Sequence, residues 1–383
     1  MGTGRVLLVS WDGGGNLPPA LALAARLVRA GHEVAVMADG SPPRPAVAAA
    51  VAASGATLVP YPSMEPWPAG VSFEDDPARF DEVRNGVATA QDSLAVAEEM
   101  HPDALVVDCM AGAGLVAAER LALPTAVLVH VLYQPFVAYW ADLAVDVNRC
   151  RSALGMATLE APVVLEQLRR LATVLALVPE SFDYPGAPRT PTTHYVGPIL
   201  DPTPPEPPAD LGFAPADDRP LVLVSLSTTA QGQQRALPVI LDALECLPAR
   251  CLLTLGGVEV GDLRTPPNVV VHEWLPHRDV LPQVAAVIGH GGLSTVMAAL
   301  AHGVPLVCVP QGREQPLNAE RVAACGAGIA LPMDAGAQEI ADATSRVLST
   351  PAFAQAAAAV KADIARHGAG EEAARRVQSL LGA

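Results

Sequence analysis

The residues with the clearest chemical potential are three glycines and a histidine in the run Gly289-His290-Gly291-Gly292. This run follows an apolar stretch that ends at Ile288 and precedes a helical segment over residues 294–301. Small residues at a helix start leave backbone N–H groups at the positive end of the helix dipole, which suits a diphosphate. His290 can donate a further hydrogen bond to the same anion. The alternative is a tight structural turn in which His290 is a satisfied loop residue.

A second glycine loop with polar side chains lies near the N-terminus, where Asp12 and Asn16 flank Gly13, Gly14 and Gly15. A dinucleotide fingerprint would need a glycine at position 18, which is proline, and its ribose-binding acid would be the rather distant Asp39. An NAD(P)-dependent oxidoreductase is therefore a remote alternative.

The apolar runs that position these loops alternate with helix-sized segments. Residues 6–10, a helical segment with Leu21 and Leu27 on one face, and residues 33–37 form a predicted β-α-β unit. Further runs at 57–59, 104–107 and 126–129 extend it to a parallel sheet with helices on both faces. After a proline-rich stretch, the alternation restarts at 221–225, 251–255, 269–271, 286–288 and 306–309. We predict two α/β domains, with a ligand cleft at the carboxyl ends of their strands.

Composition excludes several classes of protein. The 383 residues carry a net charge of −16, with a single lysine, Lys361, so a nucleic-acid partner is not expected. No stretch reaches the roughly 18 unbroken apolar residues of a membrane helix, and the first apolar run is too short for a signal peptide, so we expect a cytoplasmic protein. The six cysteines show no metal-binding spacing, and we expect no metal and no cofactor.

Residues 271–328 resemble the donor-binding signature of the family 1 nucleotide-sugar glycosyltransferases. The shared features are Trp274-Leu275-Pro276, the histidine-glycine run, a Gly-Val-Pro at 303–305 and the pair Glu314-Gln315, in the same order and at the same spacing. The resemblance implies a GT-B fold with two Rossmann-like domains facing across a cleft. It implies an acceptor domain over 1–200, a linker over 201–219, a donor domain over 220–362 and a C-terminal helix over 363–383 that packs back on the first domain.

Carried over residue by residue, the resemblance implies the donor site. Trp274 would stack on the base, with the Leu275 backbone at its edge, and Glu314 and Gln315 would bind sugar hydroxyls. The groups at the diphosphate would be Ser227, Thr228, His290, Gly291, Gly292, Ser294, Thr295 and Asn318. The alternatives are a core aromatic for Trp274 and a solvated loop for Glu314 and Gln315.

One departure from the family bears on the donor. The family often has a glutamate at the position of Ala298, where its carboxylate grips both ribose hydroxyls, and alanine cannot do so. A 2′-deoxyribose would lose nothing by this absence. We therefore expect a dTDP-sugar rather than a UDP-sugar, and a deoxysugar as the group transferred.

A second departure concerns the catalytic base. Asn16 stands where the family usually has a histidine, and Asp108 matches the aspartate that supports that histidine. Three interpretations are open. In the first, Asp12 or Asp108 is the base, with its pKa raised by burial. In the second, the acceptor is acidic enough to need little help and Asn16 only orients it. In the third, the protein binds its ligands without catalysis. Asp12 has the alternative role of capping the glycine loop.

The acceptor site is indicated by aromatic residues. His130 ends a predicted strand and precedes Tyr133, Phe136 and Tyr139, which either wall a pocket or belong to a helix core. Trp11 and Trp67 are further candidates.

We expect an inverting, metal-independent transferase with a small hydrophobic natural-product acceptor. The competing class is a sugar-nucleotide-binding accessory protein without turnover. Partners other than donor and acceptor are not indicated, and the oligomeric state, monomer or homodimer, stays open.

Overall fold

The chain forms two compact units. The computed structural model describes residues 2–68, 71, 73–140, 143–160, 167, 172–186, 189–206, 210–214, 216–227, 233–256 and 264–382. One unit comprises Met1–Pro202 with His367–Ala383, and the other comprises Thr203–Arg366.

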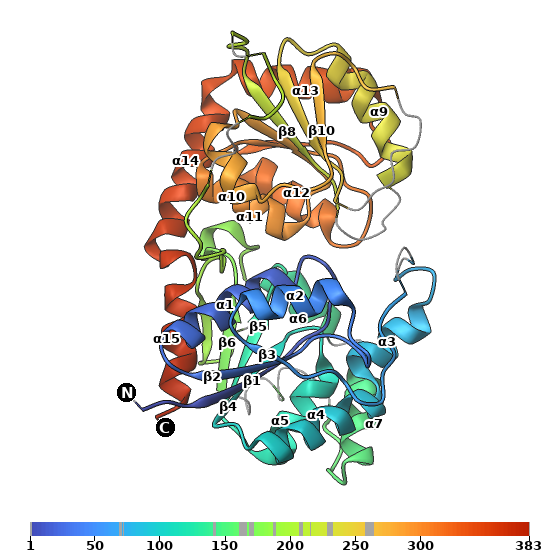
Figure 1. The fold of residues 1–383 in the computed structure, drawn as a ribbon, viewed down its shortest axis with the longest axis vertical. Helices are drawn as coiled ribbons and strands as arrows, with labels where there is room; N and C mark the ends of the chain where they lie inside the picture. The colour runs from blue at the N-terminus through green and yellow to red at the C-terminus, as the bar shows by residue number, and fades with distance from the viewer. Residues whose placement is uncertain are drawn as a thin grey trace. The chain divides into compact units, whose positions relative to one another are not determined.

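The first unit is built on a parallel sheet. Among the described residues it has seven strands in the order β3-β2-β1-β4-β5-β6-β7 (Figure 1). Their bounds are β1 Arg5–Val9, β2 Glu33–Met37, β3 Thr57–Leu58, β4 Ala104–Asp108, β5 Thr125–Val129, β6 Ala172–Ala176 and β7 Thr193–Tyr195. The strand order reverses between β1 and β4, which pair with Val6 opposite Ala104. Open α/β sheets bind ligands at such a reversal, beyond the carboxyl ends of the strands.

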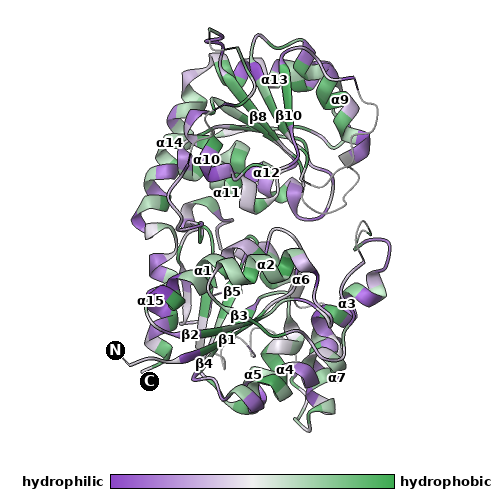
Figure 2. Cartoon of the chain, in the orientation of Figure 1, coloured by the Kyte–Doolittle hydropathy of each residue, from purple (hydrophilic) through white to green (hydrophobic). Residues whose placement is uncertain are grey.

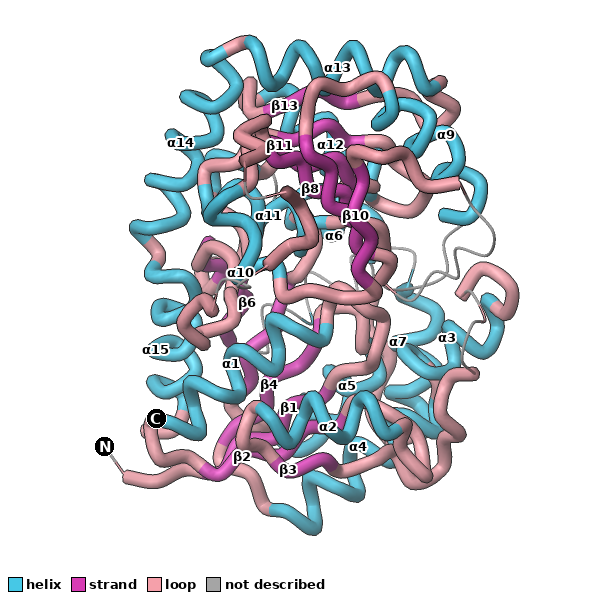
Figure 3. Tube along the Cα trace, turned by 45° about the horizontal axis from the view of Figure 1, so that its top comes forward, coloured by secondary structure: helices cyan, strands magenta, loops and turns pink. Residues whose placement is uncertain are grey.

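Helices cover both faces of this sheet, because successive strand residues point to opposite sides. Val6 and Leu8 pack in one core with α1 (Leu17–Arg29), α2 (Pro45–Ala53) and α15 (Glu371–Leu380). Leu7 and Val9 pack in another with α4 (Val87–Met100), α5 (Gly112–Leu121) and α6 (Tyr133–Trp140). Helices α3 (Pro77–Asn85) and α7 (Ala144–Ala153) complete the second side. Figure 1 shows α1 and α2 on one side of β1, with α4 and α5 on the other, and Figure 3 shows the same strands in magenta among the cyan helices.

The second unit repeats this plan. Its described strands form a six-stranded parallel sheet in the order β10-β9-β8-β11-β12-β13. They are β8 Leu221–Ser225, β9 Arg250–Thr254, β10 Val269–His272, β11 Ala286–Gly289, β12 Leu306–Cys308 and β13 Gly328–Ala330. The strand order reverses between β8 and β11, with Ser225 opposite Gly289.

Helices α9 (Gln233–Glu245) and α13 (Ala337–Ser349) pack on one face of this sheet. The remaining helices of the unit are α10 (His277–Val280), α11 (Leu293–His302), α12 (Gln315–Ala324) and α14 (Pro351–Arg366). Figure 2 shows β8 and β10 as hydrophobic, whereas α9 and α15 mix hydrophobic and hydrophilic turns, as expected of half-buried helices. The two sheets are those of the GT-B fold that the sequence predicted.

In the part of the chain that the structure describes, no helix combines the length and the apolarity needed to cross a membrane.

Candidate functional site

Three side chains from neighbouring strands meet at the strand-order reversal of the first unit. Asp108 ends β4, His130 follows β5, and Asn16 precedes α1 in the loop that follows β1. His130 Nε2 lies 3.1 Å from Asp108 Oδ1, and Asn16 Nδ2 donates to Asp108 Oδ2 at 2.9 Å. The Asp108 carboxylate therefore sits between an amide and an imidazole.

Asp108 is buried yet well supplied with hydrogen bonds. It is 3% exposed, and the Met110 N–H donates to its Oδ1 at 2.8 Å. Burial alone would raise the pKa of Asp108, but the nearby His130 imidazole and the hydrogen bonds from His130, Asn16 and Met110 outweigh burial. The pKa of Asp108 is therefore lowered. The expectation that burial raises the pKa of Asp108 for use as a base is wrong, because a counter-charge faces the carboxylate.

His130 shows the complementary shift. Burial alone would lower the pKa of His130, but the charge of Asp108, and after it Cys109, raises it well above its ordinary value. The side chain of His130 remains 13% exposed.

The ligand atoms of Asp108, Cys109 and His130 lie within 4.8 Å of one another, the one such cluster among the described residues. Both oxygens of Asp108 already accept hydrogen bonds, and burial raises the pKa of the Cys109 thiol. We therefore read these residues as a hydrogen-bonded cluster.

Asn16 fixes the glycine loop as well as Asp108. Its amide also donates to the Trp11 carbonyl at 2.7 Å, and its Oδ1 accepts the Gly13 N–H at 2.9 Å. It is 4% exposed. With all these contacts made by a buried amide, Asn16 acts as a brace for the loop and for Asp108.

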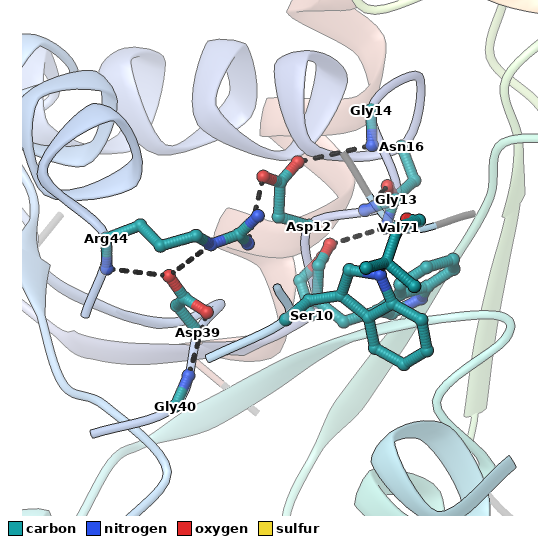
Figure 4. Close-up of polar contacts among 11 residues, drawn as sticks. Ser10, Asp12, Gly13, Gly14, Asn16, Asp39, Gly40, Arg44 and Val71 are labelled. Atoms are coloured by element: carbon teal, nitrogen blue, oxygen red, sulfur yellow. Dashed lines mark hydrogen bonds and ion pairs between the residues drawn. The ribbon is translucent and has the colours of Figure 1, made fainter. Parts of the chain in front are cut away.

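Asp12 is held by an arginine that sequence reasoning did not single out. Asp12 Oδ1 accepts the Gly14 N–H at 3.2 Å, the predicted capping of the loop, and its Oδ2 lies 3.1 Å from Arg44. Arg44 also contacts Asp39 Oδ2 at 2.9 Å. Figure 4 shows Arg44 reaching between the two carboxylates. The arginine thus ties the loop after β1 to the loop after β2, and the only sequence signal for it is its position just before α2.

The predicted acceptor aromatics divide into two groups. Trp11 and Trp67 pack with Phe73 and Phe80, with Trp11 and Phe73 centroids 5.4 Å apart. A cavity of about 20 Å³ beside Trp11 and Trp67 is no larger than a water site. The Trp11 Nε1 donor is buried and has no partner within the described ranges.

The second group lies on α6. Tyr133 is fully buried and Phe136 is 2% exposed, both in the core between sheet and helices. Of the two alternatives left open for these rings, the structure shows the helix core. The side chain of Tyr139 lies outside the described part of the chain.

In the second unit, the strand-glycine-helix junction has the predicted form. Gly291 adopts φ +82°, and Gly292 is the N-cap of α11, so the N-cap residue itself has no side chain with which to cap the helix. A Cβ at Gly292 would lie 2.3 Å from His290 Nε2, which shows that the imidazole folds over the helix start. Ser294 and Thr295 occupy the first turn of α11.

His290 is a buried neutral imidazole. It is 8% exposed, and burial lowers its pKa to about 4. Its Nδ1 has no hydrogen-bond partner among the residues described. A buried polar atom without a partner is uncommon and suits a ligand that supplies one.

The loop that carries Glu314 and Gln315 supports this junction. Gln315 is 1% exposed, and its Oε1 accepts the Gln311 N–H at 2.7 Å. Asn318 is fully buried and donates to the Gly291 carbonyl at 2.9 Å, while its Oδ1 has no partner in the described ranges. Glu314 precedes α12 and is half-buried. Gln315 is therefore not part of a solvated loop, and Asn318 braces the turn.

The remaining predicted donor residues are found around the same edge. Trp274 is 66% exposed, so the alternative of a core aromatic is excluded. Leu275 follows it and is half-buried, and Ser227 is buried after β8, whereas Thr228 lies outside the described residues. The structure adds His277, whose Nε2 lies 3.1 Å from Ser225 Oγ.

A cavity of about 310 Å³ opens beside Gln311. Arg235 and Asp334 give it polar walls, and Met333 and Ile340 give it apolar ones. Such a mixed lining suits a polar ring with apolar faces.

Comparisons with known proteins agree with this geometry. Residues 238–380 match the family described as "Erythromycin biosynthesis protein CIII-like, C-terminal domain". The 4'-demethylrebeccamycin synthase of Lentzea aerocolonigenes is 30% identical, over 98% of this chain and 99% of that protein.

Solved structures share the whole architecture. The calicheamicin glycosyltransferase CalG4 superposes with a TM-score of 0.79 at 27% identity, covering 100% of this chain and 99% of the other. The glycosyltransferase VinC, solved in complex with dTDP, has a TM-score of 0.71 at 22% identity, with 99% of each chain covered. At that identity the second likeness concerns the fold alone.

Proposed function

Because the chain belongs to the nucleotide-sugar glycosyltransferases with the GT-B fold, we propose that it transfers a deoxysugar from dTDP, with inversion, to a small hydrophobic acceptor. Its relatives include enzymes of antibiotic pathways. The second unit holds the donor in this proposal and the first unit holds the acceptor.

The observation that carries the donor proposal is the start of α11. Gly291 and Gly292 bring backbone N–H groups to the helix N-terminus, and the buried Nδ1 of His290 has no hydrogen-bond partner among the described residues. N–H groups at a helix terminus stabilise the negative charge that develops on a leaving diphosphate. The exposed Trp274 is free to stack on the base, and the half-buried Glu314 supplies a carboxylate for the sugar hydroxyls.

The preference for dTDP rests on Ala298. This residue lies on α11 two turns or fewer from the phosphate-binding end, and its methyl group cannot accept hydrogen bonds from ribose hydroxyls. The proposal is supported by VinC, a glycosyltransferase with the same fold that was solved in complex with dTDP.

Calorimetric titration with dTDP and UDP tests the donor site without knowledge of the acceptor. We expect dTDP to bind about tenfold or more tightly than UDP, because the site cannot repay desolvation of the 2′-hydroxyl. Ala298→Glu should reduce or reverse the preference for dTDP over UDP. Ala301→Glu on the same helix is the matched control. Equal affinities for both nucleotides would remove the dTDP preference.

The acceptor proposal rests on the first unit. Trp11 and Trp67 are only 8% and 9% exposed beside the small cavity, so the group that we assign to the acceptor is the buried Trp11 Nε1, a hydrogen-bond donor with no partner among the described residues. In this scheme Asp12 and Arg44 shape the loop after β1, and Asn16 and Asp108 belong to the catalytic centre.

A further inference from the structure

His130 lies beside the Asp108 carboxylate, and Asn16 stands where the family usually has its histidine. Asn16 and His130 contact the same carboxylate: Asn16 donates to Asp108 Oδ2, and His130 Nε2 lies beside Asp108 Oδ1. A histidine–aspartate pair therefore exists in this chain, with the imidazole on the other oxygen of the same carboxylate.

We propose that His130 is the general base that deprotonates the acceptor hydroxyl, with Asp108 and Asn16 as positioning residues. This inference rests on the proposed function. Because Nε2 faces Asp108, Nδ1 is the nitrogen that takes the proton.

The acceptor O–H proton moves to His130 Nδ1 while the oxygen's electron pair forms the bond to the anomeric carbon. The bond between that carbon and the diphosphate oxygen breaks, and dTDP leaves with the electron pair. Asp108 stabilises the resulting imidazolium, as a carboxylate does when it orients a catalytic histidine.

The surroundings support this assignment over a purely structural pair. His130 is the one member of the three that keeps a partly exposed side chain, at 13%, whereas Asp108 and Asn16 are 3% and 4% exposed. All three lie at the carboxyl ends of β1, β4 and β5, beside the strand-order reversal. The base therefore faces the edge of the sheet at which such folds bind ligands.

The electrostatics predict the pH dependence. The titratable groups that act on His130 are Asp108 and Cys109, and burial, followed by Asp108, raises the pKa of the neighbouring Tyr61. Asp108 raises the pKa of His130, so the neutral form that accepts a proton becomes populated as the pH rises. We expect turnover to increase through an apparent pKa above that of a free histidine.

Kinetic measurements with a panel of dTDP-sugars and phenolic or alcoholic acceptors test the proposal. We expect His130→Gln to lower kcat by about 10²- to 10⁴-fold and to abolish the rise with pH, with dTDP affinity unchanged. In Asp108→Asn, which keeps His130, the rise of turnover with pH should move to lower pH, because the counter-charge of the imidazolium is removed. His101→Gln, at an exposed position, is the control with wild-type kinetics.

A double variant that moves the imidazole to position 16 distinguishes loss of the base from structural damage in His130→Gln. Adding Asn16→His to His130→Gln places an imidazole on the other oxygen of Asp108, and we expect it to restore part of kcat and the rise with pH. Unchanged kcat in His130→Gln would overturn the proposal.

A spectroscopic measurement is independent of any substrate. Nitrogen NMR of histidine-labelled wild-type protein should show neutral His130 protonated on Nε2. Protonation on Nδ1 instead would overturn the assignment. Absence of turnover with every tested pair while dTDP binds would count against the proposed acceptor class, and the tautomer would still decide the role of His130.

Discussion

At the scale of single residues, a counter-charge decides what each buried histidine can do. His130 faces the Asp108 carboxylate, which raises its pKa, whereas burial of His290 lowers its pKa to about 4. The pKa at which the first histidine exchanges a proton therefore lies above that of a free histidine. The second stays neutral and can serve a diphosphate as a hydrogen-bond donor.

The neutrality of His290 has a consequence for stability. Its pKa is about 4 in the folded chain, below that of an unfolded histidine, so the unfolded state binds more protons between these values. Stability should therefore fall as the pH drops from about 6.5 towards 4, by up to about 3 kcal/mol from this residue.

Urea unfolding between pH 4 and 7 measures this effect. His290→Gln should reduce the loss of stability at acid pH. Part of that loss should remain, because the pKa of His277 is also lowered. An unchanged decline in the variant would show that His290 is not the group responsible.

At the scale of elements, the turn between β11 and α11 depends on one backbone conformation. Gly291 has φ +82°, and a Cβ there would lie 3.0 Å from the Gln315 carbonyl oxygen. Gly291→Ala therefore adds both backbone strain and a close contact, and should weaken dTDP binding by about tenfold or more as the N–H groups shift.

Gly303→Ala provides the matched control at the other end of α11. Gly303 has φ +77°, and its added Cβ would meet the flexible Lys361 side chain at 3.3 Å. Both variants should lose stability by roughly 1 kcal/mol, and only Gly291→Ala should lose dTDP affinity. Parallel losses of affinity in the two variants would contradict a specific role for the turn.

The elements were predictable where periodicity or glycine placement specified them. The β-α-β unit around α1 and the junction before α11 follow from apolar runs, first-turn prolines and glycines. The Asp108–His130 contact was not predictable from spacing, because it depends on β4 and β5 being neighbours in the sheet. The lowered pKa of Asp108 was missed for the same reason: without the partner, burial alone predicts a rise.

At the scale of the whole molecule, the C-terminal segment completes the first unit. Arg26 on α1 is 8% exposed and donates to the carbonyls of Ala22, Leu200 and Ala369, and it contacts Glu371 at 3.1 Å. One buried guanidinium thus joins α1 to the chain at Leu200 and to the C-terminal segment at Ala369.

Arg26→Ala should destabilise the protein by about 3 kcal/mol or more, because it leaves buried carbonyls without donors. Glu371→Gln should cost under about 1 kcal/mol, since the Glu371 side chain is 65% exposed and solvent screens the pair. Thermal or urea unfolding measures both. Equal losses would mean that the ion pair, not the carbonyl contacts, joins these segments.

The overall charge of −16 does not prevent recognition of a diphosphate. The anion site that we propose on α11 consists of backbone N–H groups and a neutral imidazole, which act locally, whereas screening limits the reach of distant carboxylates to about 10 Å.

The most direct test of the proposed transfer is the anomeric configuration of the product, read by proton NMR after reaction of an α-linked dTDP-sugar in the presence of EDTA. We predict a β-linked product, equimolar dTDP and an undiminished rate. An α-linked product, or a rate lost with EDTA and restored by a divalent cation, would contradict direct displacement by an acceptor oxygen.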